Sequence, residues 1–414
     1  MSEVKRKAKL AKEISKTFFP TTEMKNRLLV RMGEILLEQK AAILEANQLD
    51  LKKGEEEGIS KALLDRLALN DVRIEAMAEG LRQISQLPDP VGEIVETITR
   101  PNGLKIEKQR VPPGVIGIIY EARPNVTVDA AGLCLKTGNA VILRGGSAAV
   151  HSNTALIKLL HQAMEELDFP TDFLHLIEDT DRTSVDELLQ CKEYVDVIIP
   201  RGGRSLIQRV VEHSLVPVIE TGEGICHIYV HHEADPKMAE AIVLNAKCQR
   251  PSVCNAVETI LMDKSFAKKH LESMAVKLKE QGVELRGCDQ ARELVPWLGA
   301  ATEEDWSTEY LDFILAIKLV ENDEEAIKHI NQYGTGHSEA IVTQSEEAKA
   351  KFMEQVDAAC VYHNASTRFT DGFEFGFGAE IGISTQKLHA RGPMGLKELT
   401  SYKYLVFGEG QTRG

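Results

Sequence analysis

The spacing of apolar residues divides the chain into a helical N-terminal part and a longer part in which strands and helices alternate. Over residues 3 to 86, apolar side chains recur every three or four positions, which is the period of an amphipathic helix. Two β-rich runs then flank Pro101-Asn102-Gly103, a sequence typical of a hairpin turn. A lone hairpin is barely stable in water. We therefore expect it to pair with a neighbouring subunit or with the strand-like tail TSYKYLVFGEG.

From residue 114 onward, short apolar runs alternate with helical stretches. The first series of expected strands is GVIGIIY, AVILR, FLHLIED, VDVIIPR and VPVIE. A second series begins near residue 226 and contains ICHIYV, AVETILMD, LDFILAIKLV and EAIVTQ. Strands that alternate with helices predict parallel sheets with helices on both faces. The chain is therefore predicted to be an α/β protein with two doubly wound domains, separated near residues 223 and 224.

Composition narrows the class of protein. At 414 residues the chain is too long for one core, and 43% hydrophobic with 27% charged residues is ordinary for a globular enzyme. The net charge of −14 argues against a nucleic-acid partner, because phosphate backbones require a basic face. The basic N-terminus lacks the apolar segment of a signal peptide, and no apolar run is long enough to span a membrane. We therefore expect no membrane association.

The cysteines and histidines point to a reducing compartment without a structural metal. Seven cysteines are scattered singly, with no C-x-x-C pair, which favours a cytoplasmic location over a disulfide scaffold or zinc site. His227, His231 and His232 are close in sequence, but CHIYVHH reads as a strand. Alternation along a strand would place these rings on different faces, so no metal site is expected.

Two Gly-Gly turns are candidates for binding a nucleotide. The chain has neither a G-x-G-x-x-G fingerprint at a strand-to-helix junction nor a P-loop. However, Gly145-Gly146 follows AVILR and Gly202-Gly203 follows VDVIIPR, and each pair opens a predicted helix. Backbone N–H groups at such a position bind phosphate. The alternative is that both are ordinary turns between a strand and a helix.

Cys254 is the candidate nucleophile. It lies in the polar segment QRPSVCNA, between a predicted helix and a predicted strand, whereas Cys134 lies inside the apolar run AAGLCL. Arg250 lies close by in sequence and would favour the reactive thiolate, although a packing role for Cys254 is the alternative. Glu220 ends VPVIE beside glycines, a position that suits an active-site edge or a solvated loop.

The order of these segments resembles the aldehyde dehydrogenase superfamily. PPGVIGII, TGNAVILR, RGGRSLI, IETGEG, the cysteine and EYLDF follow one another as in that superfamily. More narrowly, VENDEEAIKHINQYGTGHSEAI is similar to the signature of the γ-glutamyl phosphate reductase family, also called glutamate-5-semialdehyde dehydrogenases. IYEARPNVTVDAAGLCLKTGNAVILRGG is also typical of that family, and the resemblance extends over the whole length.

The resemblance implies an activity. The chain would be an NADP-dependent oxidoreductase that reduces L-glutamyl 5-phosphate to L-glutamate 5-semialdehyde in proline biosynthesis, through a thioester on Cys254. Arg144 stands where relatives carry lysine, and Ser147 where NAD-preferring relatives carry glutamate, which favours NADPH. Glu309 matches a glutamate that contacts the nicotinamide ribose. The other implied cofactor positions are Gly145, Gly146, Gly202, Gly203 and Glu220.

Two positions bear on the mechanism. Y-E-A-R-P replaces the usual P-W-N-F-P, so the asparagine that supports the oxyanion is missing and Arg123 stands nearby. Glu220 matches the glutamate that activates water in hydrolytic aldehyde dehydrogenases, but we do not expect it to act as a base here. For the substrate's phosphate and α-carboxylate, guanidinium groups and hydroxyls are suitable donors. The candidates, each of which has a structural alternative, are Arg123, Arg250, Arg391, Ser366 and Thr367.

The resemblance also implies a domain division. Residues 1–98 and 112–223 would form the dinucleotide-binding domain and 224–398 the catalytic domain. Residues 99–111 and 399–414 would be oligomerisation strands, which implies a homo-oligomer, and an upstream glutamate kinase is a candidate transient partner. The rival hypotheses are a hydrolytic aldehyde dehydrogenase and a non-catalytic nucleotide-binding protein on the same scaffold.

Overall fold

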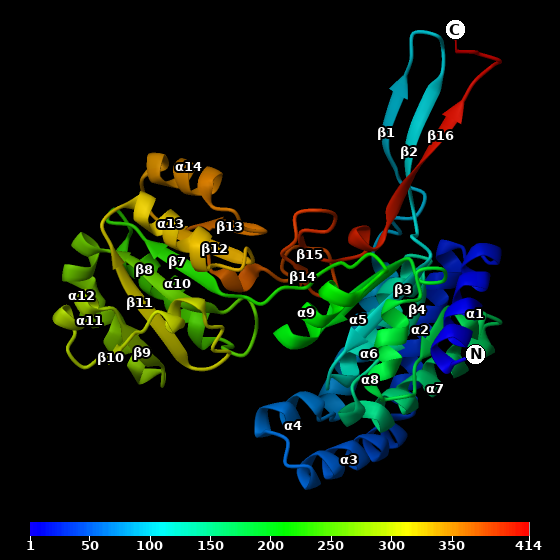
Figure 1. Cartoon of the computed structure of the whole chain (residues 1–414), viewed down its shortest axis with the longest axis horizontal. Helices are drawn as coiled ribbons and strands as arrows, with labels where there is room; N and C mark the ends of the chain where they lie inside the picture. The colour runs from blue at the N-terminus through cyan, green and yellow to red at the C-terminus, as the bar shows by residue number, and fades with distance from the viewer. Residues whose placement is uncertain (414) are drawn as a thin grey trace. The chain divides into compact units, whose positions relative to one another are not determined.

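The computed structural model describes residues 1–413, with the backbone alone at positions 61 and 62. It consists of two compact units (Figure 1). The chain passes from the first unit to the second after Glu220, close to the break expected at residues 223 and 224. The first unit comprises Met1–Glu220, Gly376–Gly382 and Met394–Gly414, and the second comprises Thr221–Phe375 and Ile383–Pro393.

The N-terminal part is helical, as its period predicts. Four of its five helices begin after a Ser, Thr or Asn whose side-chain oxygen accepts a backbone N–H of the first turn, the usual signal for a helix start. The helices are α1 (Glu3–Thr17), α2 (Thr22–Glu38), α3 (Lys40–Glu56), α4 (Lys61–Leu67) and α5 (Asp71–Gln86).

A parallel four-stranded sheet forms the centre of the first unit. Its order is β5-β4-β3-β6, with β3 (Val115–Tyr120), β4 (Ala140–Arg144), β5 (Leu174–Leu176) and β6 (Val197–Arg201). Every residue of β3 and β4 is buried, as expected for a sheet covered on both faces. The helices that connect these strands and follow β6 are α6 (Pro124–Lys136), α7 (Val150–Glu166), α8 (Arg182–Leu189) and α9 (Arg204–His213).

One strand that the sequence predicted for this sheet does not form. VPVIE forms only an isolated bridge, between Val218 and Ile198, and not a strand. Pro217 explains the difference, because proline has no N–H to donate to a ladder. Its carbonyl still accepts from the Ile198 N–H at 2.8 Å.

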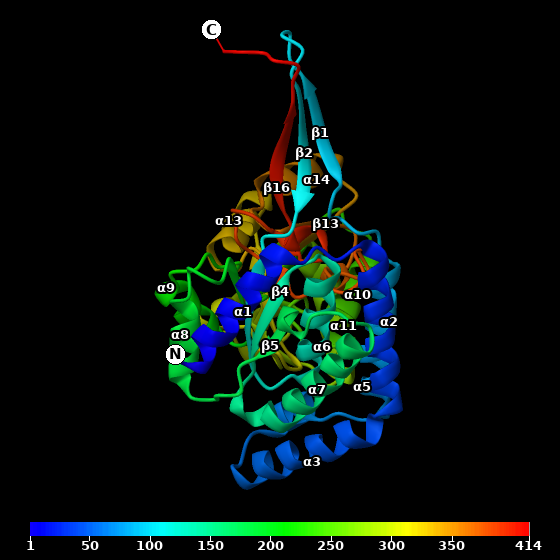
Figure 2. The ribbon, with the colours of Figure 1, turned by 90° about the vertical axis from the view of Figure 1, so that its right-hand side faces the viewer.

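The predicted hairpin and the tail form one antiparallel sheet. Its order is β1-β2-β16, with β1 (Ile94–Thr99), β2 (Lys105–Val111) and β16 (Ser401–Phe407). The expected return of the tail to the hairpin is therefore confirmed, and β1 and β2 are the two β-rich runs that flank the turn at residues 101–103. Figures 1 and 2 show this sheet extending away from the helices of its own unit.

The second unit is built on a parallel seven-stranded sheet. Its order is β10-β9-β11-β8-β7-β12-β13. The four strands predicted from sequence are β7 (Cys226–Val230), β8 (Val257–Asp263), β11 (Ile314–Val320) and β12 (Ser338–Val342). The shorter strands β9 (Glu284–Gly287), β10 (Gly299–Ala300) and β13 (Cys360–His363) complete it, and β14 (Ile383–Ser384) pairs with β15 (Gly392–Pro393) in a separate hairpin.

Two hydrophobic clusters cover the faces of this sheet. The larger contains residues from α10 and α11, and the smaller contains residues from α13 and α14. β8 is buried along its whole length between them. The helices of the unit are α10 (Pro236–Cys248), α11 (Lys264–Glu280), α12 (Asp289–Leu294), α13 (Asp323–Tyr333) and α14 (Glu346–Gln355).

Short 3₁₀ turns complete the secondary structure, and they lie at Ser147–Ala149, Thr171–Phe173, Glu304–Ser307, Thr367–Phe369 and Lys397–Leu399. Within residues 1–413, no helix has the length and apolar character needed to cross a membrane.

Candidate active site

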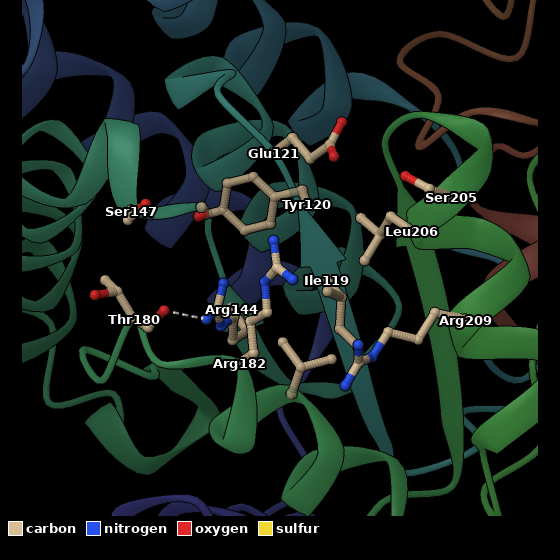
Figure 3. A pocket seen from close by; sticks show the side chains of 12 residues that line it. Ile119, Tyr120, Glu121, Arg144, Ser147, Thr180, Arg182, Ser205, Leu206 and Arg209 are labelled. Carbon is tan, nitrogen blue, oxygen red and sulfur yellow. Dashed lines mark hydrogen bonds between the residues drawn. The ribbon is translucent and has the colours of Figure 1, made fainter. Parts of the chain in front are cut away.

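A cavity of about 490 Å³ opens at the carboxyl ends of the strands of the first unit (Figure 3). β4 and β5 lie on one side of β3 and β6 on the other, so the strand order reverses at β3. Open α/β sheets bind ligands at such a switch point. The lining residues are Ile119, Tyr120, Glu121, Arg144, Gly146, Ser147, Thr180, Arg182, Val185, Ser205, Leu206 and Arg209.

Arg144 fixes one wall of this cavity. Its guanidinium donates to the carbonyl oxygens of Gly145 (3.0 Å), Thr180 (2.7 Å) and Asp181 (2.9 Å) and to the Ser184 hydroxyl (3.2 Å). Burial lowers the pKa of Arg144, against the effect of nearby acidic groups. The side chain therefore ties β4 to the start of α8, and most of its donors are used in doing so.

Arg182 is a second cation of the cavity, and sequence reasoning missed it. It is exposed at the first position of α8, and Figure 3 shows its guanidinium pointing into the cavity toward Tyr120. Arg209, also in the lining, is bound to both Asp186 carboxylate oxygens at 2.9 and 2.8 Å. The signal that could have found Arg182 is its place at the start of the helix that follows a strand of the parallel sheet.

The two Gly-Gly turns have different surroundings. A β-carbon on Gly145 would lie 2.2 Å from Asn153 Nδ2, so packing requires that glycine. Gly146 lines the cavity. The Gly203 N–H donates to Glu121 Oε2 at 2.9 Å, so a carboxylate of the chain itself engages the second turn.

Two further predicted residues lie at the edges of the first unit. Arg123 precedes Pro124, the first residue of α6, and its N–H donates to the Glu121 carbonyl at 2.7 Å. It is half-buried in the connection that leaves β3. Glu220, also half-buried, ends the unit just beyond the Val218 bridge.

The thiol loop, residues 249–256, belongs to the second unit and joins α10 to β8. Cys254 is half-buried in it. Its carbonyl oxygen accepts from the Cys226 thiol at 3.2 Å. Burial raises the pKa of the Cys226 and Cys134 thiols well above the usual range, so these two are protonated and inert at neutral pH.

A glycine packs directly against the thiol loop. A β-carbon on Gly224 would lie only 1.4 Å from the Cys254 carbonyl oxygen. The Gly224 N–H donates to Glu309 Oε1 at 2.9 Å. One glycine thus contacts the backbone of the predicted nucleophile and the predicted cofactor-binding glutamate, and the structure brings Cys254 and Glu309 together within one unit.

The segment with Ser366 and Thr367 holds the other side of the loop. The buried Thr367 hydroxyl donates to the Asn255 carbonyl at 2.7 Å, and Asn255 Nδ2 donates to the Thr370 carbonyl at 2.8 Å. The Ser366 hydroxyl accepts from the Arg368 N–H at 3.3 Å. The Thr367 hydroxyl therefore braces the loop, whereas the Ser366 hydroxyl contacts Arg368 of its own segment.

Arg368 is a cation beside the thiol that sequence reasoning did not single out. It is half-buried, and it donates to the Asn255 side chain and, at 3.0 Å, to Gln249 Oε1. Burial lowers the pKa of Arg368, and Arg250 lowers it further, whereas the Cys254 thiolate acts in the opposite direction. Arg368 thus interacts electrostatically with both Cys254 and Arg250. The signal was its place in HNASTRF, next to two predicted substrate residues.

Arg391 is engaged elsewhere in the second unit. Its guanidinium donates to Asp357 Oδ1 at 2.6 Å, and Lys387 binds the other oxygen of the same carboxylate. The pKa of Asp357 is lowered first by Lys387 and then by Arg391. This ion-pair cluster lies just before β15.

The expectation that strand alternation places the histidine rings on different faces is wrong for His231 and His232. β7 ends at Val230, so strand alternation does not extend to His231 and His232, whose ring centroids lie 3.9 Å apart. With Glu233 they form a group whose ligand atoms all lie within 4.8 Å of one another among the described residues. His227, on the strand, pairs instead with Glu339 at 3.0 Å.

The fold and thiol loop define a class of protein, and comparison with known proteins identifies it. The sequence model of the aldehyde dehydrogenase family matches residues 2–303 and 305–405. The chain therefore belongs to the aldehyde dehydrogenase family, whose members are oxidoreductases that use a nicotinamide cofactor and a small-molecule substrate. The predicted α/β fold and family membership are confirmed.

Similar relatives share one name. A protein of Moorella thermoacetica named gamma-glutamyl phosphate reductase is 58% identical over 412 residues, which cover 99% of both chains. The crystal structure of gamma-glutamyl phosphate reductase from Thermotoga maritima is 50% identical, with a TM-score of 0.97 and 100% of each chain covered. An acetylating aldehyde dehydrogenase of Geobacillus thermoglucosidasius, 17% identical with a TM-score of 0.69 over 99% of this chain and 97% of that one, shares the fold. The narrower resemblance in the sequence is thereby confirmed.

Proposed function

We propose that the chain reduces L-glutamyl 5-phosphate to L-glutamate 5-semialdehyde and inorganic phosphate with NADPH, as a step of proline biosynthesis. The name shared by full-length relatives of 50% identity or more supports this activity. The observation that carries it is the setting of Cys254, a half-buried thiol that interacts electrostatically with Arg368, which in turn interacts with Arg250. That setting suits a nucleophile whose substrate bears a phosphate leaving group.

The covalent step begins at the Cys254 sulfur. Its thiolate, having lost its proton beforehand, attacks the acyl carbon of the substrate, and a sulfur–carbon bond forms. The bond between that carbon and the phosphate oxygen breaks, and phosphate leaves with the electron pair. A thioester remains on Cys254. Positive charge near the leaving group stabilises the negative charge that accumulates on phosphate.

Arg250 and Arg368 are the cations placed to supply that charge. Two guanidinium groups close together repel one another, as the lowering of the Arg368 pKa by Arg250 shows. An anion bound near both would relieve the repulsion and accept planar, charge-assisted hydrogen bonds. We therefore assign the substrate's phosphate to this pair. The hydroxyls of Ser366 and Thr367 then contribute by holding Arg368 and the loop.

The cavity of the first unit fits a dinucleotide. It lies at the switch point of a parallel sheet, and Gly146 and Ser147 line it where a phosphate can approach the backbone. Arg182 lies in the same lining, whereas most of the hydrogen-bond donors of Arg144 already bind groups of the chain. We therefore assign the 2′-phosphate of NADPH to Arg182, and Arg144 shapes the wall of the cavity. When bound, the cofactor supplies the hydride that reduces the thioester carbon. Glu309 would hold the nicotinamide ribose, and Glu220 would border the cofactor without activating water.

The antiparallel sheet of the first unit supports a homo-oligomer. Tyr404, Val406 and Phe407 of β16 are 62%, 58% and 50% exposed. β1 and β16 are also edge strands, whose unpaired backbone groups favour pairing with another chain. We therefore propose that this sheet joins copies of the chain. Contact with a glutamate kinase stays a prediction, as does a cytoplasmic location.

The reaction run in reverse tests the proposed function. Glutamate semialdehyde and NADP⁺ are supplied with and without inorganic phosphate, and NADPH formation is followed by absorbance. We expect formation that requires phosphate and is lost in Cys254→Ala. Cys248→Ala is the matched control, since Cys248 is also half-buried and ends α10 just before the loop. Phosphate-independent formation would instead indicate hydrolysis of the thioester by water.

A further inference from the structure

A buried ion pair joins the two ends of the thiol loop. Lys247, in the last turn of α10, donates to Glu258 Oε2 on β8 at 2.6 Å, and both side chains are fully buried. Burial raises the pKa of Glu258 to about 7, against the lowering effect of Lys247. An ion pair of this kind often contributes no more stability than apolar residues of the same volume. Its presence here therefore points to a role other than stability.

The second oxygen of Glu258 is bound to the segment that carries Glu309. Glu258 Oε1 accepts from the Leu311 N–H at 3.2 Å. Leu311 has a φ of 53°, a left-handed conformation that is strained for a bulky residue and persists only where the surroundings hold it. The carboxylate supplies such a contact. It thus stabilises an unfavourable backbone conformation two residues beyond Glu309.

Tyr310 lies between Glu309 and Leu311 in the sequence, and its side chain is held by separate contacts. Its hydroxyl donates to Asp305 Oδ1 at 2.6 Å, and its ring lies 5.9 Å from Lys247 Nζ and 5.4 Å from the Arg286 guanidinium. The same lysine that pairs with Glu258 thus also faces the Tyr310 ring. Backbone and side-chain contacts together restrict residues 309–311.

A continuous series of contacts links the Glu309 segment to the predicted nucleophile. Glu309 Oε1 accepts from the Gly224 N–H, and Gly224 packs against the Cys254 carbonyl. β8, which carries Glu258, follows the thiol loop directly. Leu311 and Glu309 are two residues apart in one segment, and each is held by a hydrogen bond to a different part of the unit.

We propose that Glu258 is a positioning residue that sets the Glu309 carboxylate through the Leu311 N–H, with Lys247 as its counter-ion. The inference rests on the proposed function, because it takes Glu309 as the residue that holds the nicotinamide ribose. Glu258 acts on cofactor binding through the backbone and is not a catalytic residue.

Two double variants isolate the contact with Leu311. Lys247→Met with Glu258→Gln removes both charges but retains an acceptor for the Leu311 N–H, whereas Lys247→Met with Glu258→Met removes the acceptor as well. NADPH affinity is measured by fluorescence titration, which does not depend on turnover. We expect Kd within twofold of wild type for the first variant and at least about fivefold weaker for the second. Equal affinities in the two variants would overturn the inference.

A third substitution separates positioning from a general structural effect. Glu309→Gln should weaken NADPH binding in the wild-type background but add little in the Lys247→Met, Glu258→Met background, because the two changes act on one interaction. Fully additive losses would contradict the proposal. Wild-type protein that binds no NADPH would overturn the proposed function and this inference together, whereas binding with equal variant affinities overturns the inference alone.

Hydrogen exchange gives a measurement on the unmodified protein, should a double variant not fold. NADPH should slow exchange of the Leu311 N–H by at least about tenfold, because a ribose on Glu309 restrains the segment. Exchange unchanged by saturating NADPH would count against the coupling.

Discussion

Gly224 and Cys254 are in direct backbone contact, with room for no side chain between them, since a β-carbon at Gly224 would overlap the Cys254 carbonyl oxygen at 1.4 Å. The position of the predicted nucleophile therefore depends on a glycine that lies in another segment of the second unit.

Gly224→Ala should lower kcat by about a hundredfold or more, because displacing a reacting group by about 1 Å costs roughly that factor. It should also destabilise the protein by about 1–3 kcal/mol through overpacking. Steady-state rates and thermal unfolding check both effects. Gly80→Ala in α5 is the control, since its nearest neighbour would lie 4.0 Å away, and it should leave both quantities unchanged or raise stability. Normal activity in Gly224→Ala would exclude a rigid thiol loop.

The two arginines near Cys254 should govern phosphate binding. In the reverse reaction, Arg250→Met and Arg368→Met should each raise KM for inorganic phosphate about tenfold or more, because each removes a charged hydrogen-bond donor worth about 1.5–3 kcal/mol. Arg368→Met should also lower kcat, since it loosens the contact with Asn255. Arg292→Met, on α12, is the control. A KM that changes only for the semialdehyde would assign these arginines to the α-carboxylate instead.

Arg182 should decide between the two nicotinamide cofactors. Arg182→Gln is expected to weaken NADPH about tenfold and leave NADH nearly unchanged, since only NADPH carries the 2′-phosphate. Arg144→Gln should act differently and destabilise the protein, because it removes the guanidinium donor of the Thr180 carbonyl and one of the donors of the Asp181 carbonyl, which keeps the Ser184 hydroxyl. Kd values for both cofactors with each variant separate these roles. If Arg182→Gln keeps the preference for NADPH over NADH and Arg144→Gln loses it, the 2′-phosphate would be assigned to Arg144 instead.

His329 should make the protein sensitive to acid. Burial lowers the pKa of His329 to about 2, with help from His227 and Lys318, whose ammonium lies 3.0 Å from Nδ1. The unfolded chain, with a pKa near 6.5, therefore binds a proton that the folded chain does not. Its contribution to stability is present above pH 6.5 and falls as the pH is lowered below that value, by up to about 1.4 kcal/mol per pH unit.

Proton uptake on unfolding measures this directly. At pH 5.5, the wild-type protein should take up about one proton more than His329→Gln when urea unfolds it. Glutamine cannot titrate but still offers an oxygen to Lys318. His213→Gln, at the exposed end of α9, should behave as wild type. Identical uptake by wild type and His329→Gln would mean that the buried ring is protonated in the folded state.

Local patterns in the sequence predicted the longer strands of both sheets and the family, but not the short strands β9, β10 and β13. Apolar periodicity reports whether a segment is buried, and caps such as Asn70 and Asn322 report where helices begin. The prediction failed at VPVIE, where Pro217 removes a ladder donor, and at His231 and His232, where the strand ends too early for alternation to apply.

The sequence by itself determined the α/β class, the family and the segment that carries the thiol, because these follow from short-range patterns of burial and from motifs. Only the tertiary structure decided which side chains surround Cys254. Gly224 and Arg368 are distant from it in sequence, as Leu311 is from Glu258, and nothing local to any of these residues indicates its partner. Such pairs are set by the packing of strands and loops brought together from different parts of the chain, which is a property of the folded sheet and not of any one segment.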